Sequence, residues 1–186
     1  MSNFIGIYDN ILTSKTCQFI IEEFEKDPGK KPGIISMGGY DVVAKSQKDS
    51  TDLTLSFFEG SELTNSLSDG LAEGTEMYCK EYPEVDSINN WTVFPSFNIQ
   101  KYLPGQGFHN PHCESDSSGN PRVLAWMFYL NTVTDGGETR FPSYDLNVQP
   151  VEGRLVIWPA YFTHIHHGIV SSTQTKYIAT GWHAFY

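Results

Sequence analysis

The sequence predicts a mostly β fold with helices packed outside it, an α+β arrangement. After residue 90 the chain is a succession of short segments rich in β-branched and aromatic residues, which favour strands. These segments cover residues 91–103, 123–130, 137–141, 154–158, 164–170 and 176–185. Glycine-containing turn signals separate them at residues 104–105, 119–121, 135–137 and 152–153. Many short strands divided by such turns are typical of a sandwich or barrel.

Two helices are expected before residue 90, because apolar residues recur there at helical spacing. Ser14 is a suitable N-cap for the first helix, which Pro28 and the glycine after it would end. The second helix is expected over residues 61–82 and is followed by a proline. Gly70 and Gly74 fall inside this second segment and lower its helical propensity.

The segment between the helices, residues 33–52, is polar and contains Gly38 and Gly39. One interpretation is a loop or lid that becomes ordered over a substrate. The other is an ordinary surface hairpin, which the sequence favours slightly.

The composition is that of a globular chain rather than a disordered one. Of the 186 residues, 39% are hydrophobic and 18% are charged, which allows a sizeable core. We expect a single domain over residues 1–186. Residues 1–90 would supply helical support and a lid region, and residues 91–186 the β core.

Charge and cysteine content argue against several classes of partner and compartment. The formal net charge of -10 argues against nucleic acid and anionic membranes, because both reward clusters of Lys and Arg. No signal-peptide pattern is seen, and no apolar run approaches the roughly 18 residues that a membrane span needs. Three cysteines without C-x-x-C spacing favour a reducing, cytoplasmic setting over a disulfide framework or structural zinc site.

His112 and Glu114 are the first candidate metal ligands. If their segment is extended, both side chains project to one face and Cys113 projects to the other. A third ligand from a distant strand would complete a triangular face and leave three positions open, which is the geometry of iron(II) oxygenases. The H-x-E pattern alone is weak, and an ordinary surface loop would explain it equally well.

The third ligand would come from a cluster of three histidines, namely His164, His166 and His167. In a strand, His164 and His166 would share a face while His167 would point away. Only one of the three is needed, and the residues alone leave the choice open.

From about residue 98 to its end, the chain resembles the 2-oxoglutarate- and Fe(II)-dependent dioxygenases of the prolyl 4-hydroxylase group. Five elements carry this resemblance in the family's order. They are Gln100-Lys101-Tyr102-Leu103-Pro104-Gly105-Gln106, His112-Cys113-Glu114 in place of H-x-D, Tyr129-Leu130-Asn131, Gly136-Gly137-Glu138-Thr139-Arg140-Phe141, and His166-x-Gly168 followed ten residues later by Lys176. Each element is weak alone, but their joint order is specific.

The resemblance implies a double-stranded β-helix, or jelly-roll, core with the N-terminal helices packed on it. It selects His166 as the third ligand, so that His112, Glu114 and His166 would hold the iron. The family's usual acidic ligand is Asp, and the extra methylene of Glu114 leaves open whether it binds through one oxygen or two. Retention of a carboxylate here argues for hydroxylation rather than halogenation.

The resemblance also implies residues that bind the co-substrate. Lys176 would pair with the far carboxylate of 2-oxoglutarate, because a buried cation is costly unless it is paired. Tyr129 would donate its hydroxyl to the same carboxylate, and Tyr102 would line the site. The plainer alternatives are a lysine at a fraying strand end and, for Tyr129, a core aromatic residue.

Two further side chains are possible substrate contacts. Trp182 shares the inward face of the last expected strand with Lys176. Arg140 could face the substrate, although an exposed strand arginine is an equally good interpretation.

The implied reaction is hydroxylation of an unactivated C–H bond with O2, which releases succinate and CO2, with ascorbate as a reductant. The leading substrate is a prolyl residue in a peptide or protein, on family analogy. The alternatives are the same chemistry on a free amino acid or small metabolite, and a non-catalytic jelly-roll binding module.

Overall fold

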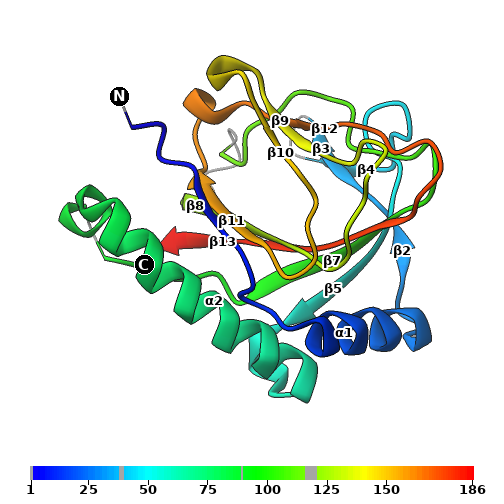
Figure 1. The fold of residues 1–186 in the computed structure, drawn as a ribbon, viewed down its shortest axis with the longest axis horizontal. Coiled ribbons are helices and arrows are strands. Elements are labelled where there is room, and N and C mark those ends of the chain that lie inside the picture. The colour runs from blue at the N-terminus through cyan, green and yellow to red at the C-terminus, as the bar shows by residue number, and fades with distance from the viewer. Residues whose placement is uncertain (1, 38–39, 89, 116–120) are drawn as a thin grey trace.

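Two facing antiparallel sheets form the centre of the computed structural model, which describes residues 2–37, 40–88, 90–115 and 121–186 (Figure 1). The larger, eight-stranded sheet has the order β1-β11-β8-β13-β7-β5-β2, with β6 also paired to β13. The smaller sheet has the order β10-β9-β12, and β3 and β4 form a separate hairpin. The predicted mostly β, jelly-roll fold with flanking helices is confirmed.

The strands of the larger sheet are β1 (Gly6–Tyr8), β2 (Lys31–Pro32), β5 (Thr51–Ser56), β6 (Trp91–Val93), β7 (Ser96–Tyr102), β8 (Arg122–Tyr129), β11 (Leu155–Pro159) and β13 (Lys176–Phe185). The other strands are β3 (Ile35–Met37), β4 (Tyr40–Val42), β9 (Thr139–Phe141), β10 (Leu146–Val148) and β12 (His167–Gly168). The helices are α1 (Ser14–Lys26) and α2 (Glu62–Glu81), with short 3-10 turns at Phe57–Glu59, Pro83–Ser87, Pro142–Tyr144 and Phe162–His164.

Helix α2 matches its expected range, whereas the cap of α1 differs by one residue. Ser61 caps α2 by accepting a hydrogen bond from the Thr64 amide. In α1 the cap is Thr13 rather than Ser14, because the Thr13 hydroxyl accepts from the Thr16 amide. Both helices lie on the face of the larger sheet that is turned away from the smaller sheet (Figure 1).

The two glycines that weaken α2 lie on its buried face. A Cβ added at Gly74 would collide with Leu155 of β11, and one added at Gly70 would meet Leu12 at 2.8 Å. The lost helical propensity is therefore offset by close approach of α2 to the sheet.

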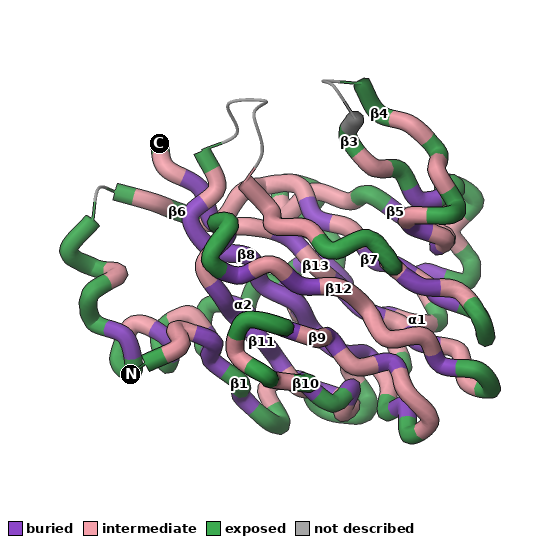
Figure 2. Tube along the Cα trace, turned by 90° about the horizontal axis from the view of Figure 1, so that it is seen from above, coloured by how far each residue is buried: buried purple, intermediate pink, exposed green. Residues whose placement is uncertain are grey.

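Two cores lie on opposite faces of the larger sheet, and β8 contributes to both by alternation. Trp126 and Phe128 pack in the core under the helices, whereas Met127 and Tyr129 pack in the core between the sheets. Buried residues accordingly follow β8, β11 and β13 through the middle of the molecule (Figure 2).

The expected strand at residues 164–170 is wrong for most of its length. Residues Phe162–His164 form a 3-10 turn, and only His167–Gly168 pairs in a sheet. The expected strand at 91–103 divides into β6 and β7 around Pro95, because proline cannot donate a ladder hydrogen bond.

The segment at residues 33–52 contains the β3–β4 hairpin, which projects from the body of the molecule (Figure 2). This agrees with the surface-hairpin interpretation, while closure as a lid stays a prediction. Residues 38–39 of the expected loop and 119–120 of an expected turn lie outside the described residues.

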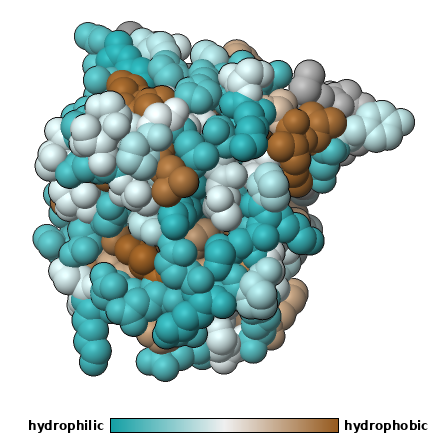
Figure 3. Space-filling model, turned by 90° about the vertical axis from the view of Figure 1, so that its right-hand side faces the viewer, coloured by the Kyte–Doolittle hydropathy of each residue, from teal (hydrophilic) through white to brown (hydrophobic). Residues whose placement is uncertain are grey.

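The molecular surface seen in Figure 3 is mostly hydrophilic and is interrupted by small apolar patches. No helix in the described part of the chain is long and apolar enough to cross a membrane.

Candidate metal centre

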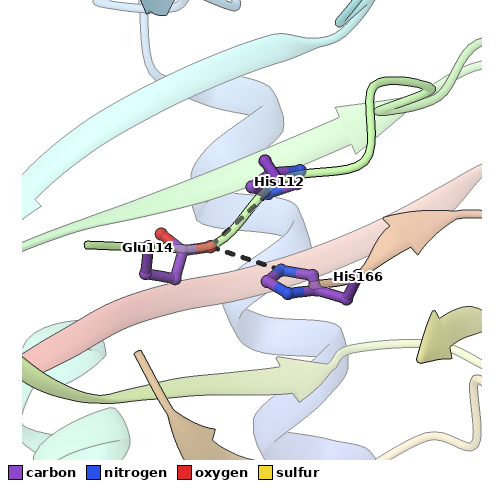
Figure 4. Close-up of side chains that lie close together, drawn as sticks. All are labelled: His112, Glu114 and His166. Atoms are coloured by element: carbon purple, nitrogen blue, oxygen red, sulfur yellow. Dashed lines mark ion pairs between the residues drawn. The ribbon is translucent and has the colours of Figure 1, made fainter. Parts of the chain in front are cut away.

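The three predicted metal ligands come together at one end of the space between the sheets. The Nε2 atoms of His112 and His166 lie 3.5 Å and 3.3 Å from the same oxygen, Oε1 of Glu114. All three donor atoms lie within 4.8 Å of one another. Figure 4 shows the carboxylate facing both imidazoles, with the ion-pair contacts converging on one oxygen.

The backbone brings the two histidines together although they are far apart in the sequence. His112 and His166 form an isolated antiparallel bridge in which each amide donates to the other's carbonyl, at 3.0 Å and 2.9 Å. The amide of Glu114 donates to the carbonyl of Ala160 at 3.0 Å. Backbone hydrogen bonds therefore hold the H-x-E segment alongside the segment that carries His166.

Backbone carbonyls select the metal-binding tautomer of both imidazoles. Nδ1 of His112 lies 2.8 Å from the carbonyl oxygen of Asn110, and Nδ1 of His166 lies 2.9 Å from that of His164. A carbonyl can only accept, so each Nδ1 carries the hydrogen and each Nε2 keeps a free lone pair. Both lone pairs then face the carboxylate, which is the arrangement that a divalent metal requires.

Glu114 is held as a carboxylate. Burial raises its pKa, but the adjacent imidazoles of His112 and His166 outweigh burial and bring the pKa well below its usual range. Its second oxygen, Oε2, accepts a hydrogen bond of 2.7 Å from the indole Nε1 of Trp182. Phe108 stacks on the His112 ring at 3.8 Å, which limits how that imidazole can turn.

A cavity of about 740 Å³ opens beside these three residues. Alternate residues of β13, namely Lys176, Ile178, Thr180 and Trp182, line it, as the inward face of that strand was expected to do. Met127 of β8 adds a further apolar wall.

Lys176 supplies a buried positive charge inside this cavity. The residue is 8% exposed, and its ammonium donates to the carbonyl of Gly137 at 2.7 Å. Burial lowers the pKa of Lys176 to about 8, and the nearby charge of Glu138 opposes this change. Among the described residues no carboxylate forms an ion pair with it. The ammonium is thus available to an anion that enters the cavity.

Residues 97–184 match the family model of the 2OG-Fe(II) oxygenase superfamily. The matched segment is similar to this superfamily and makes up slightly less than half of the 186 residues. The match covers the strands from β7 to β13 and therefore every residue of the metal centre.

A protein named as a probable prolyl 4-hydroxylase is also similar to the chain. The chain is 24% identical over 207 residues to probable prolyl 4-hydroxylase 9 of Arabidopsis thaliana, a match that covers 94% of this chain. It covers 66% of that protein, so the chain spans slightly less than two thirds of its relative's length.

Solved structures of prolyl hydroxylases share the fold at low sequence identity. The 2OG complex of the viral collagen prolyl hydroxylase from Paramecium Bursaria Chlorella virus-1 has a TM-score of 0.72 at 18% identity, covering 98% of this chain and 97% of that one. The Pseudomonas putida prolyl-4-hydroxylase has a TM-score of 0.73 at 14% identity, covering 100% and 94%. A Trichoplax adhaerens prolyl hydroxylase, in complex with a peptide of the hypoxia inducible factor, has a TM-score of 0.75 at 15% identity, covering 98% and 84%.

The donor set of the chain fits the metal and co-substrate of the superfamily, Fe(II) and 2-oxoglutarate, with O2 as the oxidant. Two neutral imidazoles and one carboxylate are the protein ligands that mononuclear non-haem iron(II) takes. The cavity beside them provides room for a small diacid, and the ammonium of Lys176 provides a partner for its far end. The residues present therefore fit both Fe(II) and 2-oxoglutarate.

The two predicted tyrosines lie differently with respect to the cavity. Tyr102 lines it and donates its hydroxyl to Oε1 of Gln100 at 2.6 Å. Tyr129 is fully buried beneath the lining, and its hydroxyl bonds Oγ1 of Thr139 at 2.7 Å. Thr139 does line the cavity. A direct bond from Tyr129 to the co-substrate stays a prediction, and it would require Tyr129 to release Thr139.

Arg140 lies outside the cavity lining. Its guanidinium bonds Asp145 at 2.6 Å and Asn147 at 3.0 Å, across the β9–β10 pair. Contact between Arg140 and a substrate stays a prediction that this arrangement does not favour. Trp182 does line the cavity, and its bond to Glu114 was not foreseen, because strand alternation does not show which polar atom an inward indole will reach.

The structure also separates the three clustered histidines. His164 and His166 do not share a strand face, because His164 ends a 3-10 turn and its Nε2 bonds the carbonyl of Asn3 at 2.8 Å. His167 lies on β12 opposite Arg140. Of the three, only His166 places Nε2 against Glu114.

Proposed function

We propose that this chain is an Fe(II)- and 2-oxoglutarate-dependent dioxygenase that hydroxylates a prolyl residue in a peptide or protein. The observation that carries the proposal is the presence of two preset imidazoles, a carboxylate and the buried ammonium of Lys176 in one cavity. When bound, the iron and 2-oxoglutarate supply the oxidising chemistry that converts C–H to C–OH, with release of succinate and CO2.

The residues of the chain hold and orient these groups. His112, Glu114 and His166 would hold the iron, and the carbonyls behind the two imidazoles prevent the rings from presenting a proton to it. Lys176 would pair with the far carboxylate of 2-oxoglutarate. The apolar walls at Met127 and Ile178 would exclude water from the space between.

A polar floor leads away from the metal centre and supports a peptide substrate. The cavity continues along β5 and β7, where Thr54 lies opposite Asn98 in the ladder and both line the cavity. Ser96 and Gln100 extend this floor on either side. Uncharged hydroxyl and amide groups in a row can hydrogen-bond the backbone of an extended chain.

The size of the cavity also supports a second candidate, the same chemistry on a free amino acid or small metabolite. A volume of about 740 Å³ lies within the range of small-molecule pockets, roughly 300–1,000 Å³. A non-catalytic binding module has less support, because it would not require two preset imidazoles beside a buried ammonium.

The test of the reaction class is an anaerobic titration of the protein with Fe(II) and 2-oxoglutarate. We expect the visible charge-transfer band of the chelate with the wild type and its loss in His166→Ala. The matched control is His164→Ala, which removes a neighbouring imidazole but keeps the backbone carbonyl that orients His166. An undiminished band in His166→Ala would reject this ligand set.

The substrate class is tested separately by 2-oxoglutarate turnover in the presence of peptides. We expect proline-containing peptides to stimulate succinate release and to gain the mass of one oxygen, while matched peptides with alanine at that position do neither. Stimulation by free amino acids alone would favour the second candidate. Prolyl peptides that leave turnover unchanged while another residue type raises it would refute the prolyl assignment.

We also propose that the protein functions in a reducing, cytoplasmic setting. Cys17, Cys79 and Cys113 are all free thiols, and burial raises the pKa of Cys17 to about 11, which keeps it protonated. Subcellular fractionation checks this proposal, and recovery from an oxidising, secretory compartment would contradict it.

A further inference from the structure

The two oxygens of Glu114 have different surroundings, and the difference depends on Trp182. We propose that Trp182 is a positioning residue that keeps Glu114 a one-oxygen metal ligand and so preserves a coordination position for O2. This inference rests on the proposed iron site. It concerns the residue at which the chain departs from the Asp that is usual in its family.

Oxygen Oε1 is the one that faces the metal donors. It lies 3.5 Å from Nε2 of His112 and 3.3 Å from Nε2 of His166. Oxygen Oε2 instead accepts the indole hydrogen of Trp182 at 2.7 Å and lies 3.8 Å from the guanidinium of Arg122. Oε1 is thus turned to the ligand set, and Oε2 is held by the indole of Trp182 beside the charge of Arg122.

The hydrogen bond opposes rotation of the carboxylate into a chelating position. A donor bonded to an ionised oxygen in a poorly solvated site forms a charge-assisted bond, roughly twice as strong as a neutral one. The side chain of Glu114 is 16% exposed, so water can replace that bond only partly. To bind a metal through both oxygens, Glu114 would have to give up the bond from Trp182.

Trp182 is itself fixed in place by its strand and by Arg122. It lies within β13, opposite Ala125 of β8, where the sheet is continuous. The guanidinium carbon of Arg122 lies 3.6 Å from the centroid of the indole, a close cation–π contact. Arg122 also donates to the backbone carbonyl of Glu114 at 2.8 Å. One arginine therefore ties together the indole and the residue whose carboxylate it bonds.

The number of oxygens that Glu114 contributes decides whether O2 has a place to bind. A six-coordinate metal with two imidazoles and one carboxylate oxygen keeps three positions open, and a chelating 2-oxoglutarate uses two of them. A second oxygen from Glu114 would occupy the last position. The longer side chain of Glu, relative to Asp, makes this outcome accessible unless Oε2 is held elsewhere.

The test counts water molecules on the metal, with Mn(II) in place of Fe(II) and water-proton relaxation as the readout. With the wild type we expect about three exchangeable waters on Mn(II), falling to about one when 2-oxoglutarate is added. With Trp182→Phe, which keeps an aromatic ring for Arg122 but removes the N–H, we expect about two waters, falling to about none.

Trp126→Phe is the matched control. Trp126 lies on the neighbouring strand β8, in the core under the helices, and its Nε1 has no hydrogen-bond partner among the described residues. This variant also loses an indole N–H, and we expect it to keep the wild-type water counts. Wild-type counts in Trp182→Phe, with Mn(II) and 2-oxoglutarate both bound, would overturn the inference.

Failure of this inference can be distinguished from failure of the proposed function. Failure of the wild type to bind Mn(II) and 2-oxoglutarate would reject the proposed function instead. If Trp182→Phe does not fold, X-ray absorption of the wild-type Fe(II)–2-oxoglutarate complex decides the question. A carboxylate bound through one oxygen would support the role of Trp182, and a carboxylate bound through both would overturn it.

Discussion

Replacement of Lys176 by methionine should make the metal-free protein more stable while it weakens binding of 2-oxoglutarate. The pKa of Lys176 is about 8, compared with 10.5 for an ordinary lysine, because burial disfavours the charged form. At about 1.4 kcal/mol per pKa unit, the buried charge costs about 3 kcal/mol of folding free energy at pH 7. Loss of the hydrogen bond to the Gly137 carbonyl offsets about 1 kcal/mol of this. We therefore expect Lys176→Met to gain about 2 kcal/mol in the free energy of unfolding.

The sign of the pH dependence follows from the same pKa. Between about pH 8 and pH 10.5 the unfolded chain holds a proton on Lys176 that the folded chain has lost. The contribution of this residue to stability therefore rises with pH across that window. Binding of 2-oxoglutarate responds in the opposite direction, because it requires the ammonium. Its affinity for the wild type should fall about tenfold from pH 7 to pH 9, and this fall should be absent in Lys176→Met.

The assays are urea unfolding of the metal-free protein and calorimetric titration of 2-oxoglutarate into the Mn(II)-loaded protein. At pH 7 we expect Lys176→Met to bind 2-oxoglutarate at least about thirtyfold more weakly, the effect of losing about 2 kcal/mol of a buried charge contact. Lys101→Met is the control, since Lys101 lies on the same strand pair but bonds Glu25 on the outer side. Unchanged affinity in Lys176→Met would refute the assignment of the anion pocket, and a loss of stability would refute the electrostatic argument.

Two further predictions concern the fold. Burial lowers the pKa of His183 from 6.5 to about 4. The contribution of His183 to stability is therefore present above about pH 6.5, and about 3 kcal/mol of it should be lost as the pH falls to about 4. Urea unfolding across this range should show a flatter pH dependence in His183→Gln, and an identical dependence would contradict the prediction. Gly74→Ala should destabilise the protein by about 1–3 kcal/mol despite the better helical propensity of alanine, because the added methyl would collide with Leu155. The exposed Glu73→Ala on the same helix is the control, and thermal unfolding that ranks the two variants equally would refute the packing argument.

Strong local patterns made the elements around the site predictable. The period of apolar residues and the proline after residue 82 defined α2, and the last strand was expected over the same residues that form β13. Alternation along a strand placed Lys176 and Trp182 on one face of β13, and the resemblance to the dioxygenase family implied that this face points inward.

Non-local contacts made the remaining elements unpredictable from sequence. Only His167–Gly168 of the strand expected at residues 164–170 pairs in a sheet, and the backbone of His166 pairs instead with His112 in an isolated bridge. The hydroxyl of Tyr129 has Thr139 within reach, a partner that only the packing of β8 against β9 supplies. Neither contact leaves a trace in the local sequence around these residues.

The sequence by itself determined the fold class and, through its resemblance to the dioxygenase family, the candidate ligands His112, Glu114 and His166. These conclusions rest on residue type, order and spacing, which a linear chain displays directly. Only the tertiary structure decided which nitrogen of each imidazole carries the hydrogen and which oxygen of Glu114 is held by Trp182. The nitrogens depend on carbonyls only two residues earlier in the chain, whose direction is set by the folded backbone, and the bond from Trp182 to Glu114 joins residues that lie far apart in the sequence.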